Sequence, residues 1–236
     1  MKRNIPNALT CCNLLCGALS VICVVYDGNF AVAFALILMG AVFDFLDGFM
    51  ARLLGVSSPI GKELDSLADD ITFGLAPASM LFMYIFEPLG YWALVALLMA
   101  AFSALRLAKF NLDERQTTSF IGLATPANAI FWGSLTAALS LYEHSMPLWV
   151  PATMAVLSLL SCYLLVSEIP FFSLKFKNMS WQDNSVRFVF LCGALLIIIA
   201  AVIVGAIVSW AYALAAGAAV IVWYVALSLF SQRRGE

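Results

Sequence analysis

The stretch Asp44-Phe-Leu-Asp-Gly-Phe-Met-Ala-Arg52, followed after eight residues by Gly61-Lys-Glu-Leu-Asp-Ser-Leu-Ala-Asp-Asp70, is a polar segment in a hydrophobic sequence. It holds six of the fourteen acidic residues. In a helix over residues 30–52, five residues would share one face, within a sector of about 140°: Asp44, Asp47, Gly48, Ala51 and Arg52. A second helix from Gly61 would place Asp65 and Asp69 on one face, with Asp70 pointing elsewhere. Two such helices, packed antiparallel, would bring four carboxylates together, which predicts a site for divalent cations.

The composition indicates an integral membrane protein. Of the 236 residues, 64% are hydrophobic and 11% are charged, which leaves too little polar surface for a water-soluble globule. The six cysteines lie in apolar runs without a Cys-x-x-Cys pair, so we interpret them as buried thiols. The only histidine, His144, lies in a predicted loop, and this excludes most histidine-dependent mechanisms. No separate soluble domain is visible, and residues 1–236 are interpreted as one membrane domain.

Hydropathy predicts an all-α polytopic fold with about eight transmembrane helices. Each segment has the length of about 20 residues that a hydrocarbon core of about 30 Å requires. The predicted spans are Leu9–Tyr26, Phe30–Arg52, Leu64–Phe86, Tyr91–Lys109, Ala124–Tyr142, Leu148–Val166, Val186–Val208 and Trp210–Phe230.

The distribution of basic residues predicts the orientation. With eight spans, both termini and the even-numbered loops share one side, and this side with the adjoining span ends holds all twelve lysines and arginines. The other side carries only Asp27, Glu87, Glu143 and His144, so the positive-inside rule places both termini in the cytoplasm. A six-span alternative would scatter these charges. Asp44 would then lie roughly 12 Å inside the cytoplasmic boundary marked by Arg52, in the cell membrane.

The ligand types at this site favour hard cations. Carboxylate oxygens select Mg²⁺, Mn²⁺ or Ca²⁺ over Zn²⁺. Four carboxylates can bridge two ions about 3.5 to 4 Å apart, an arrangement used for in-line displacement at phosphorus. The small residues Gly48, Ala51 and Gly61 would leave room for a base or a diphosphate, although they also serve plain helix packing. Arg52 would hold a phosphate or anchor the helix at the interface.

The pattern Asp44-x-x-Asp47-Gly48-x-x-Ala51-Arg52-x₈-Gly61-x-x-x-Asp65-x-x-x-Asp69 resembles the signature of the CDP-alcohol phosphatidyltransferases at every position. The resemblance implies metal-dependent transfer of a phosphatidyl group from a CDP-lipid to an alcohol, with release of CMP, by a homodimer. It further implies that Asp44, Asp47 and Asp65 are metal ligands, and that Asp69 contributes to the metal site and acts as the general base. Gly48, Ala51, Arg52 and Gly61 would line the cytidine diphosphate pocket.

The flanking sequence is similar to the phosphatidylserine synthase branch of this family. The similarity covers about the first 130 residues and is carried by four segments: Ile5-Pro6-Asn7-x-x-Thr10, Leu64-Asp-Ser-Leu-Ala-Asp69 running into Phe73-Gly74-x-Ala76-Pro77, Leu105-Arg106-Leu-Ala-Lys109-Phe110-Asn111 and Phe120-Ile-Gly122-Leu-x-Thr125-Pro126-Ala127. It implies CDP-diacylglycerol as donor and L-serine as acceptor. Asp70 and Lys109 depart from the pattern of this branch. These departures bear on the identity of the acceptor and not on the core reaction.

Further polar residues are candidates for substrate contacts. Asn7, Thr10 and Ser57 would reach the CDP-lipid together with Asp47, which also faces it. The carboxylate of serine would need a cation, for which Arg106 and Lys109 are candidates, and Thr125 is a further candidate for contact with serine. Interfacial anchoring, helix capping and turn formation are the alternative roles of these residues.

Three other readings of the sequence remain open. Another member of the same family, a phosphatidylglycerophosphate or inositol-phosphate lipid synthase, should carry a denser basic cluster for its phosphorylated acceptor. A membrane prenyltransferase also uses aspartates and Mg²⁺, but the Gly-x-x-Ala-Arg element argues against it. A cation-coupled transporter should show mid-membrane ionisable residues and an internal repeat, which we do not find in residues 124–230.

Overall fold

The computed structural model describes residues 4–56, 58–112, 120–142, 147–172, 174 and 180–232. Almost all of these residues are helical. In chain order the helices are α1 (Asn4–Tyr26), α2 (Phe30–Leu54), α3 (Pro59–Asp69), the π-helix η1 (Asp70–Leu75), α4 (Ala76–Leu89), the 3-10 helix η2 (Gly90–Leu97), α5 (Leu98–Leu112), α6 (Thr125–Leu139), α7 (Trp149–Val166), α8 (Trp181–Ile207) and α9 (Trp210–Gln232). Two short strands, β1 (Phe120–Ile121) and β2 (Pro170–Phe171), pair antiparallel.

By length and composition, six helical segments of the described residues qualify to cross a membrane. They are Asn4–Tyr26, Phe30–Leu54, Pro59–Leu112, Trp149–Val166, Asn184–Ile207 and Trp210–Ser231. The fold is therefore helical and fits a multi-pass membrane protein. The eight-span count stays a prediction, because six segments qualify. The cytoplasmic termini also stay a prediction, since seven of the twelve basic residues on which the orientation depends lie outside the described residues: Lys2, Arg3, Arg115, Lys175, Lys177, Arg233 and Arg234.

The segment Pro59–Leu112 covers two of the predicted spans. The chain reverses at Gly90, which adopts a φ of 55° that only glycine tolerates readily. The returning α5 packs beside η1 and α3. At its far end Lys62 Nζ donates to the carbonyl oxygen of Asn111 at 3.0 Å, and Asn111 Nδ2 donates to Ser66 Oγ at 2.8 Å. This single helical segment is thus a hairpin. The 15-residue α6, predicted as a fifth span, is shorter than the other candidates.

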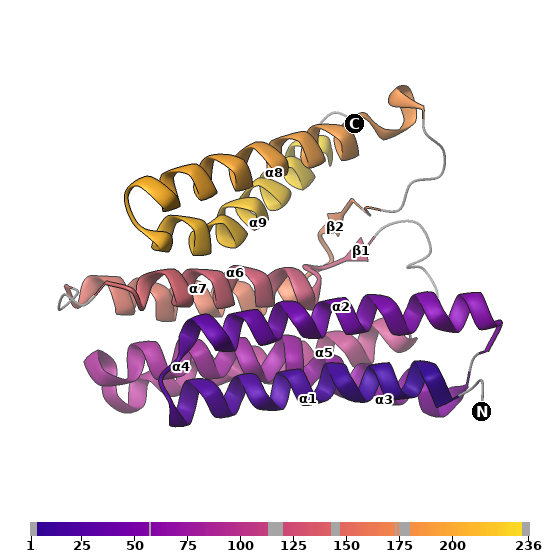
Figure 1. Ribbon diagram of the computed structural model, residues 1–236, viewed down its shortest axis with the longest axis horizontal. Helices are drawn as coiled ribbons and strands as arrows, with labels where there is room; N and C mark the ends of the chain where they lie inside the picture. The colour runs from indigo at the N-terminus through magenta and orange to yellow at the C-terminus, as the bar shows by residue number, and fades with distance from the viewer. Residues whose placement is uncertain are drawn as a thin grey trace.

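The helices form three groups across the molecule (Figure 1). Helices α1 to α5 pack together on one side, α6 and α7 lie in the middle, and the α8–α9 pair lies on the other side. Helix α6 contacts α2, α4 and α9. Its Trp132 is fully buried and donates from Nε1 to Ser161 Oγ of α7 at 2.9 Å. Because a Cβ at Gly133 would lie only 2.7 Å from Phe34 Cδ2, glycine there lets α2 approach α6.

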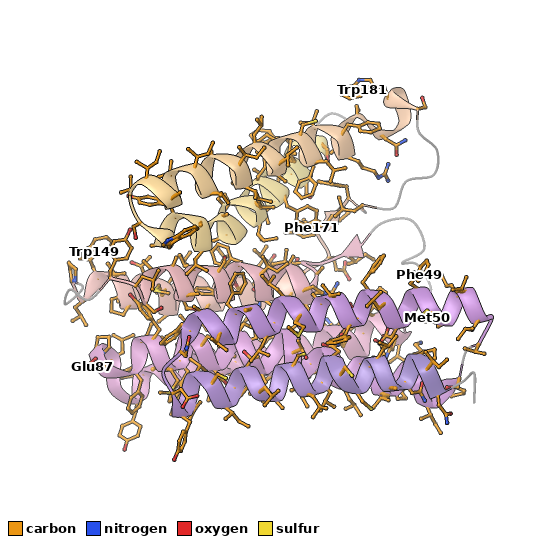
Figure 2. The ribbon with its side chains drawn as sticks, in the orientation of Figure 1. Phe49, Met50, Glu87, Trp149, Phe171 and Trp181 are labelled. Atoms are coloured by element: carbon orange, nitrogen blue, oxygen red, sulfur yellow. The ribbon has the colours of Figure 1, made fainter. Side chains whose placement is uncertain are left out.

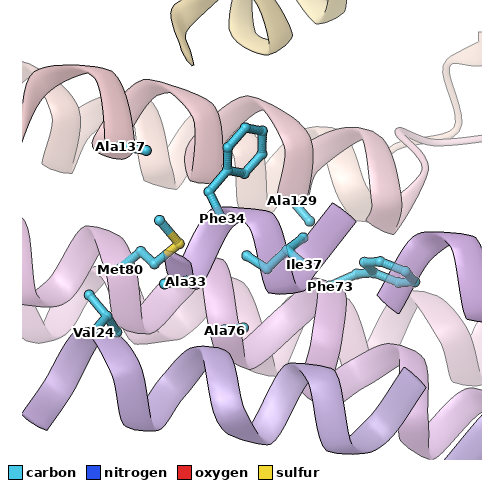
Figure 3. Packing of buried hydrophobic residues seen from close by; sticks show 9 residues of the cluster. All are labelled: Val24, Ala33, Phe34, Ile37, Phe73, Ala76, Met80, Ala129 and Ala137. Atoms are coloured by element: carbon cyan, nitrogen blue, oxygen red, sulfur yellow. The ribbon is translucent and has the colours of Figure 1, made fainter. Parts of the chain in front are cut away.

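Small residues bring α1, α2 and η1 into close contact. Figure 3 shows the apolar part of this core, where Ile37 of α2, Phe73 of η1 and Met80 of α4 are buried together. A Cβ at Gly17 of α1 would lie 2.7 Å from Thr72 Cα, which no side chain could accommodate without a backbone shift. Thr72 Oγ1 also donates to the carbonyl oxygen of Asn13 at 2.9 Å. These contacts fix η1, and with it the end of α3, against the two N-terminal helices.

Candidate functional site

Three aspartates come together where α2 and α3, which both pack on α1, approach each other. Asp44 and Asp47 stand one turn apart on α2, and Asp65 stands on α3. One carboxylate oxygen of each lies within 4.8 Å of the others. Asp47 is buried, with 6% of its surface exposed, and the other two are half-buried. The spacing in the sequence therefore becomes a cluster of three carboxylates in space.

The turn between the two helices sets this geometry. Helix α2 ends at Gly55, whose φ of 61° suits glycine and whose backbone N–H bonds back to the last turn. Helix α3 begins after Ser58, whose Oγ accepts from the backbone N–H of Gly61 at 3.0 Å, and Pro59 occupies its first position. A helix stop and a helix start, only a few residues apart, reverse the chain, so that α3 packs on α1, which also packs on α2.

Helix α1 orients two of the aspartates. Thr10 Oγ1 donates to Asp47 Oδ2 at 2.6 Å, and Asn13 Nδ2 donates to Asp69 Oδ1 at 3.0 Å. Thr10 and Asn13 are both buried and stand three residues apart, so they share a face of α1. The sequence analysis placed Thr10 at the nucleotide and missed Asn13. The signal for Asn13 was present, because buried polar or small residues recur at helical spacing at positions 10, 13, 17 and 20.

Asp69 and Asp70, adjacent in sequence, face different neighbours. Asp69 lies beside the cluster and interacts electrostatically with Asp44 and Asp65, although it is outside the set of three whose oxygens fall within 4.8 Å. Asp70 Oδ1 lies near Ser103 of α5, since both would be within 2.8 Å of a Cβ at Gly74. Asp69 is therefore part of the site's surroundings, and Asp70 belongs to the contact with α5.

The donor set fits a divalent cation. The charges that act on Asp44 and Asp65 are those of neighbouring aspartates, and Asp65 Oδ1 is a buried oxygen without a hydrogen-bond partner. Carboxylates this close repel one another unless a cation or a proton neutralises them. Oxygen-only ligands suit Mg²⁺, Mn²⁺ or Ca²⁺, and the cluster does not distinguish among these ions. Asp44, Asp47 and Asp65 could therefore hold a divalent cation through their carboxylate oxygens.

A cavity of about 270 Å³ adjoins the cluster. It is lined by α1, by the end of α2, by the turn and by α3. Seven residues predicted for the site are among its walls: Asn7, Thr10, Asp47, Gly48, Ala51, Gly61 and Asp65. The sequence analysis did not single out four further wall residues: Pro6, Val56, Ser58 and Lys62. Exposed Arg52 lies at the rim, with Nη1 3.6 Å from the position of a Cβ at Gly48. Ser57 lies outside the described residues.

The residues predicted to bind the acceptor are not equally placed. Arg106 of α5 is 7% exposed, its Nε has no hydrogen-bond partner, and its guanidinium lies 6.0 Å from the ring centroid of Phe110. It interacts electrostatically with Asp69. Lys109 is exposed, and Thr125 is buried at the first position of α6. Among these three, Arg106 is the residue that the structure places near an aspartate of the site.

Fold and site define the class of this protein. It belongs to the CDP-alcohol phosphatidyltransferase family, whose model matches residues 3–227. Among its relatives is the CDP-diacylglycerol–serine O-phosphatidyltransferase of Bacillus subtilis, 34% identical over 168 residues that cover 71% of this chain and 89% of the relative.

Two relatives with the same enzyme name are similar over a shorter region. The one from Helicobacter pylori (strain 26695) is 36% identical over 128 residues, which cover 53% of this chain and 54% of the relative. The one from Mycobacterium leprae is 38% identical over 135 residues, which cover 53% of this chain and 44% of the relative. The chain thus spans about half the length of these two relatives.

Proposed function

We propose that this protein transfers the phosphatidyl group of CDP-diacylglycerol to the hydroxyl of L-serine and releases CMP. The observation that carries the proposal is the carboxylate cluster of Asp44, Asp47 and Asp65 beside a pocket walled by Gly48, Ala51 and Gly61. The printed names of the relatives support serine as acceptor.

The aspartates would hold two divalent cations, with Mg²⁺ or Mn²⁺ as the expected ions and Ca²⁺ able to occupy the same oxygen ligands. Asp44, Asp47 and Asp65 would be the main ligands, with Asp69 contributing. Bound there, the cations would neutralise the diphosphate and stabilise the negative charge that develops on the departing nucleotide. Thr10 fixes the carboxylate of Asp47 in position for this task.

Asp69 is our candidate for the general base. Its Oδ1 accepts from Asn13, which leaves Oδ2 to take the proton from the serine hydroxyl. The serine oxygen then attacks the lipid-side phosphorus, the bond from that phosphorus to the bridging oxygen breaks, and its electrons leave with CMP. Asn13 acts here as a positioning residue, because it fixes which oxygen of Asp69 faces the acceptor.

The pocket beside the cluster would take the cytidine diphosphate. Asn7 and Thr10 offer polar groups, while Gly48, Ala51 and Gly61 let the ligand approach the backbone. A Cβ at Gly61 would stand 3.0 Å from Ser58 Oγ and 3.2 Å from Asn7 Oδ1, so a side chain there would narrow the pocket. Arg52 at the rim and Lys62 in the wall supply positive charge for phosphate oxygens. A contact from Ser57 stays a prediction.

Arg106 is the strongest candidate for the serine carboxylate. A buried guanidinium with a free Nε requires an anion or a polar partner. Since Arg106 interacts electrostatically with Asp69, one serine molecule could direct its hydroxyl to Asp69 and its carboxylate to Arg106. Lys109 and Thr125 complete the predicted acceptor set. The exposure of Lys109 favours an interfacial role for that residue.

The proposed setting is the cytoplasmic membrane, with eight crossings and both termini in the cytoplasm. The reaction would take place near the cytoplasmic face, where the donor's headgroup lies, within a single domain of residues 1–236. The family resemblance adds a homodimer. Labelling of cysteines introduced at the two termini, in intact cells and in broken membranes, tests the orientation.

The acceptor assay tests the reaction. Membranes containing the protein are incubated with CDP-diacylglycerol and labelled serine, with Mg²⁺, with Mn²⁺ or with EDTA. We expect label in lipid together with an equal amount of CMP, and loss of both with EDTA. Transfer to glycerol 3-phosphate or inositol in place of serine would overturn the acceptor, and absence of CMP release with every acceptor would overturn the reaction.

A further inference from the structure

Tyr224 of α9 is a buried polar residue that the proposed mechanism does not use. Only 7% of its surface is exposed, and its hydroxyl donates to the carbonyl oxygen of Phe172 at 3.0 Å. Three phenylalanine rings lie against it, with centroids 4.9 to 5.8 Å from its own: Phe171, Phe172 and Phe190. Figure 2 shows Phe171 between the α8–α9 pair and the layer of α6 and α7. The rings and the hydrogen bond therefore fix the direction of the phenol.

The contacts of Tyr224 connect α9 to the segment 120–127, which resembles the phosphatidylserine synthase branch. The strand β1 opens this segment and pairs with β2, which also contacts α9. Leu123 belongs to the same buried cluster as Phe171 and Tyr224. Tyr224 and Ala127 also line an apolar cavity of about 700 Å³ beside α2. Helix α9 thus packs on the part of the chain whose sequence points to the acceptor.

Tyr224 also stands near the residues proposed to bind serine. It interacts electrostatically with Arg106, which in turn interacts with Asp69. Ser228 follows one turn later on the same face of α9, and its Oγ is buried without a hydrogen-bond partner, as is Nε of Arg106. Buried polar atoms of this kind call for a ligand atom or a water molecule. The acceptor side of the site therefore has polar groups that the fold itself leaves unpaired.

Serine brings three polar groups, and the proposed function gives partners to two of them. Its hydroxyl is assigned to Asp69 and its carboxylate to Arg106. Its ammonium group carries three N–H donors, which need oxygen acceptors in a buried site. A carboxylate in that place would pair with Arg106 and compete with the carboxylate of serine. The phenol oxygen of Tyr224 is neutral, and its hydrogen is already donated to Phe172, so it can accept without neutralising Arg106.

We propose that Tyr224 is a specificity-determining residue of the acceptor site, whose phenol oxygen accepts a hydrogen bond from the ammonium group of L-serine. Ser228 Oγ is the second acceptor on the same helix face. The inference rests on the proposed function and deepens it, because Asp69, Arg106 and Tyr224 then contact all three polar groups of serine. It also gives α9, which lies beyond the segments that resemble the branch, a part in selecting the acceptor.

Two analogues of serine separate the proposed contacts. 3-Hydroxypropionate keeps the hydroxyl and the carboxylate but lacks the ammonium group, whereas ethanolamine lacks the carboxylate. Tyr224→Phe removes only the phenol oxygen. Tyr212→Phe, at an exposed position of α9, is the matched control. For each protein in detergent, with CDP-diacylglycerol and Mg²⁺ or Mn²⁺, the KM for labelled serine and the inhibition constants of both analogues against it are measured.

The two analogues should respond to different variants. We expect Tyr224→Phe to raise the KM for serine and the inhibition constant of ethanolamine about 10- to 100-fold, the range for a hydrogen bond to a charged group. The inhibition constant of 3-hydroxypropionate should stay unchanged, because this analogue has no ammonium group. Arg106→Gln should show the reverse, weakening 3-hydroxypropionate and leaving ethanolamine unchanged. Tyr212→Phe should alter none of these values.

A purely structural role of Tyr224, through its bond to Phe172, would weaken both analogues alike and raise the KM for CDP-diacylglycerol. Either result would overturn the inference, as would an unchanged KM for serine in Tyr224→Phe. The unmodified protein gives a test without a variant, since 3-hydroxypropionate should bind at least about tenfold more weakly than serine. Equal binding of the two would contradict a contact to the ammonium group. If the unmodified protein yields neither serine lipid nor CMP, the proposed function itself fails.

Discussion

Two helix pairs, α1–α2 and α8–α9, are both apolar enough to cross a membrane, yet they differ in what they bury. The most apolar window of α1 has a mean hydropathy of 2.2 with 33% of its residues buried, against 3.0 and 17% for α8. Helix α1 turns Thr10, Asn13 and Ser20 inward, whereas α8 exposes leucines and isoleucines. The comparison shows that polar residues at helical spacing, and not hydropathy, mark the helices that build the site.

The largest expected effect is the loss of a cluster carboxylate. Asp65→Asn removes a charge from the proposed cation site, and we expect kcat for serine transfer to fall more than about 100-fold, beyond the range of a supporting residue. Asp70→Asn, which changes a carboxylate at the α5 contact, should stay within about threefold. Turnover in the presence of Mg²⁺ or Mn²⁺ measures both, and a gel-filtration profile in detergent checks the fold. An active Asp65→Asn protein would remove the metal site from the mechanism.

The next effect sharpens the role of α1. Asn13→Leu deletes the donor that holds Asp69, and we expect kcat to fall about 10- to 100-fold. Ser20→Ala on the same helix breaks a buried hydrogen bond to the carbonyl oxygen of Ala33 and should leave kcat unchanged. Initial rates at saturating substrate compare the two variants. Equal losses in both would mean that α1 acts only through packing.

A third prediction separates acceptor from donor binding. Arg106→Gln removes the buried guanidinium beside Asp69, so we expect KM for serine to rise about 10- to 100-fold, as the loss of a charged hydrogen-bond partner predicts. KM for CDP-diacylglycerol should not change. Lys109→Gln, at an exposed position of the same helix, tests the other basic candidate, and an interfacial role for Lys109 predicts an unchanged KM for serine. A rise in both KM values for Arg106→Gln would indicate general disruption of the site.

The smallest effect concerns stability and compares the two pairs directly. Gly17→Ala would press a Cβ against the backbone of Thr72, 2.7 Å from its Cα, and overpacking of this kind costs about 1 to 3 kcal/mol. Leu196→Ala on the exposed face of α8 should cost less than about 0.5 kcal/mol. Thermal unfolding in detergent, followed by tryptophan fluorescence, measures both midpoints. A larger shift for Leu196→Ala would reverse the proposed order of the two pairs.

Much of the site was predictable because it is local in sequence. The spacing of Asp44, Asp47 and Asp65 fixes which side chains share a helix face, and Gly55, Ser58 and Pro59 stop one helix and start the next. The way in which the two helices converge depends in addition on α1, against which both α2 and α3 pack. The partners of Asp47 and Asp69 were not predictable in this way, since Thr10 and Asn13 lie 37 and 56 residues away in the chain.

The sequence by itself indicated a helical membrane protein, because hydropathy and helical periodicity act over one or two turns. Its aspartate pattern, which resembles the family signature, indicated the CDP-alcohol phosphatidyltransferase family. Tertiary structure alone decided that Arg106 is buried near Asp69 while Lys109 is exposed, and that α9 leaves a cavity beside α2. The physical reason is close packing. Which faces meet depends on glycines and alanines spread over the whole chain, and no single stretch of sequence contains both partners of such a contact.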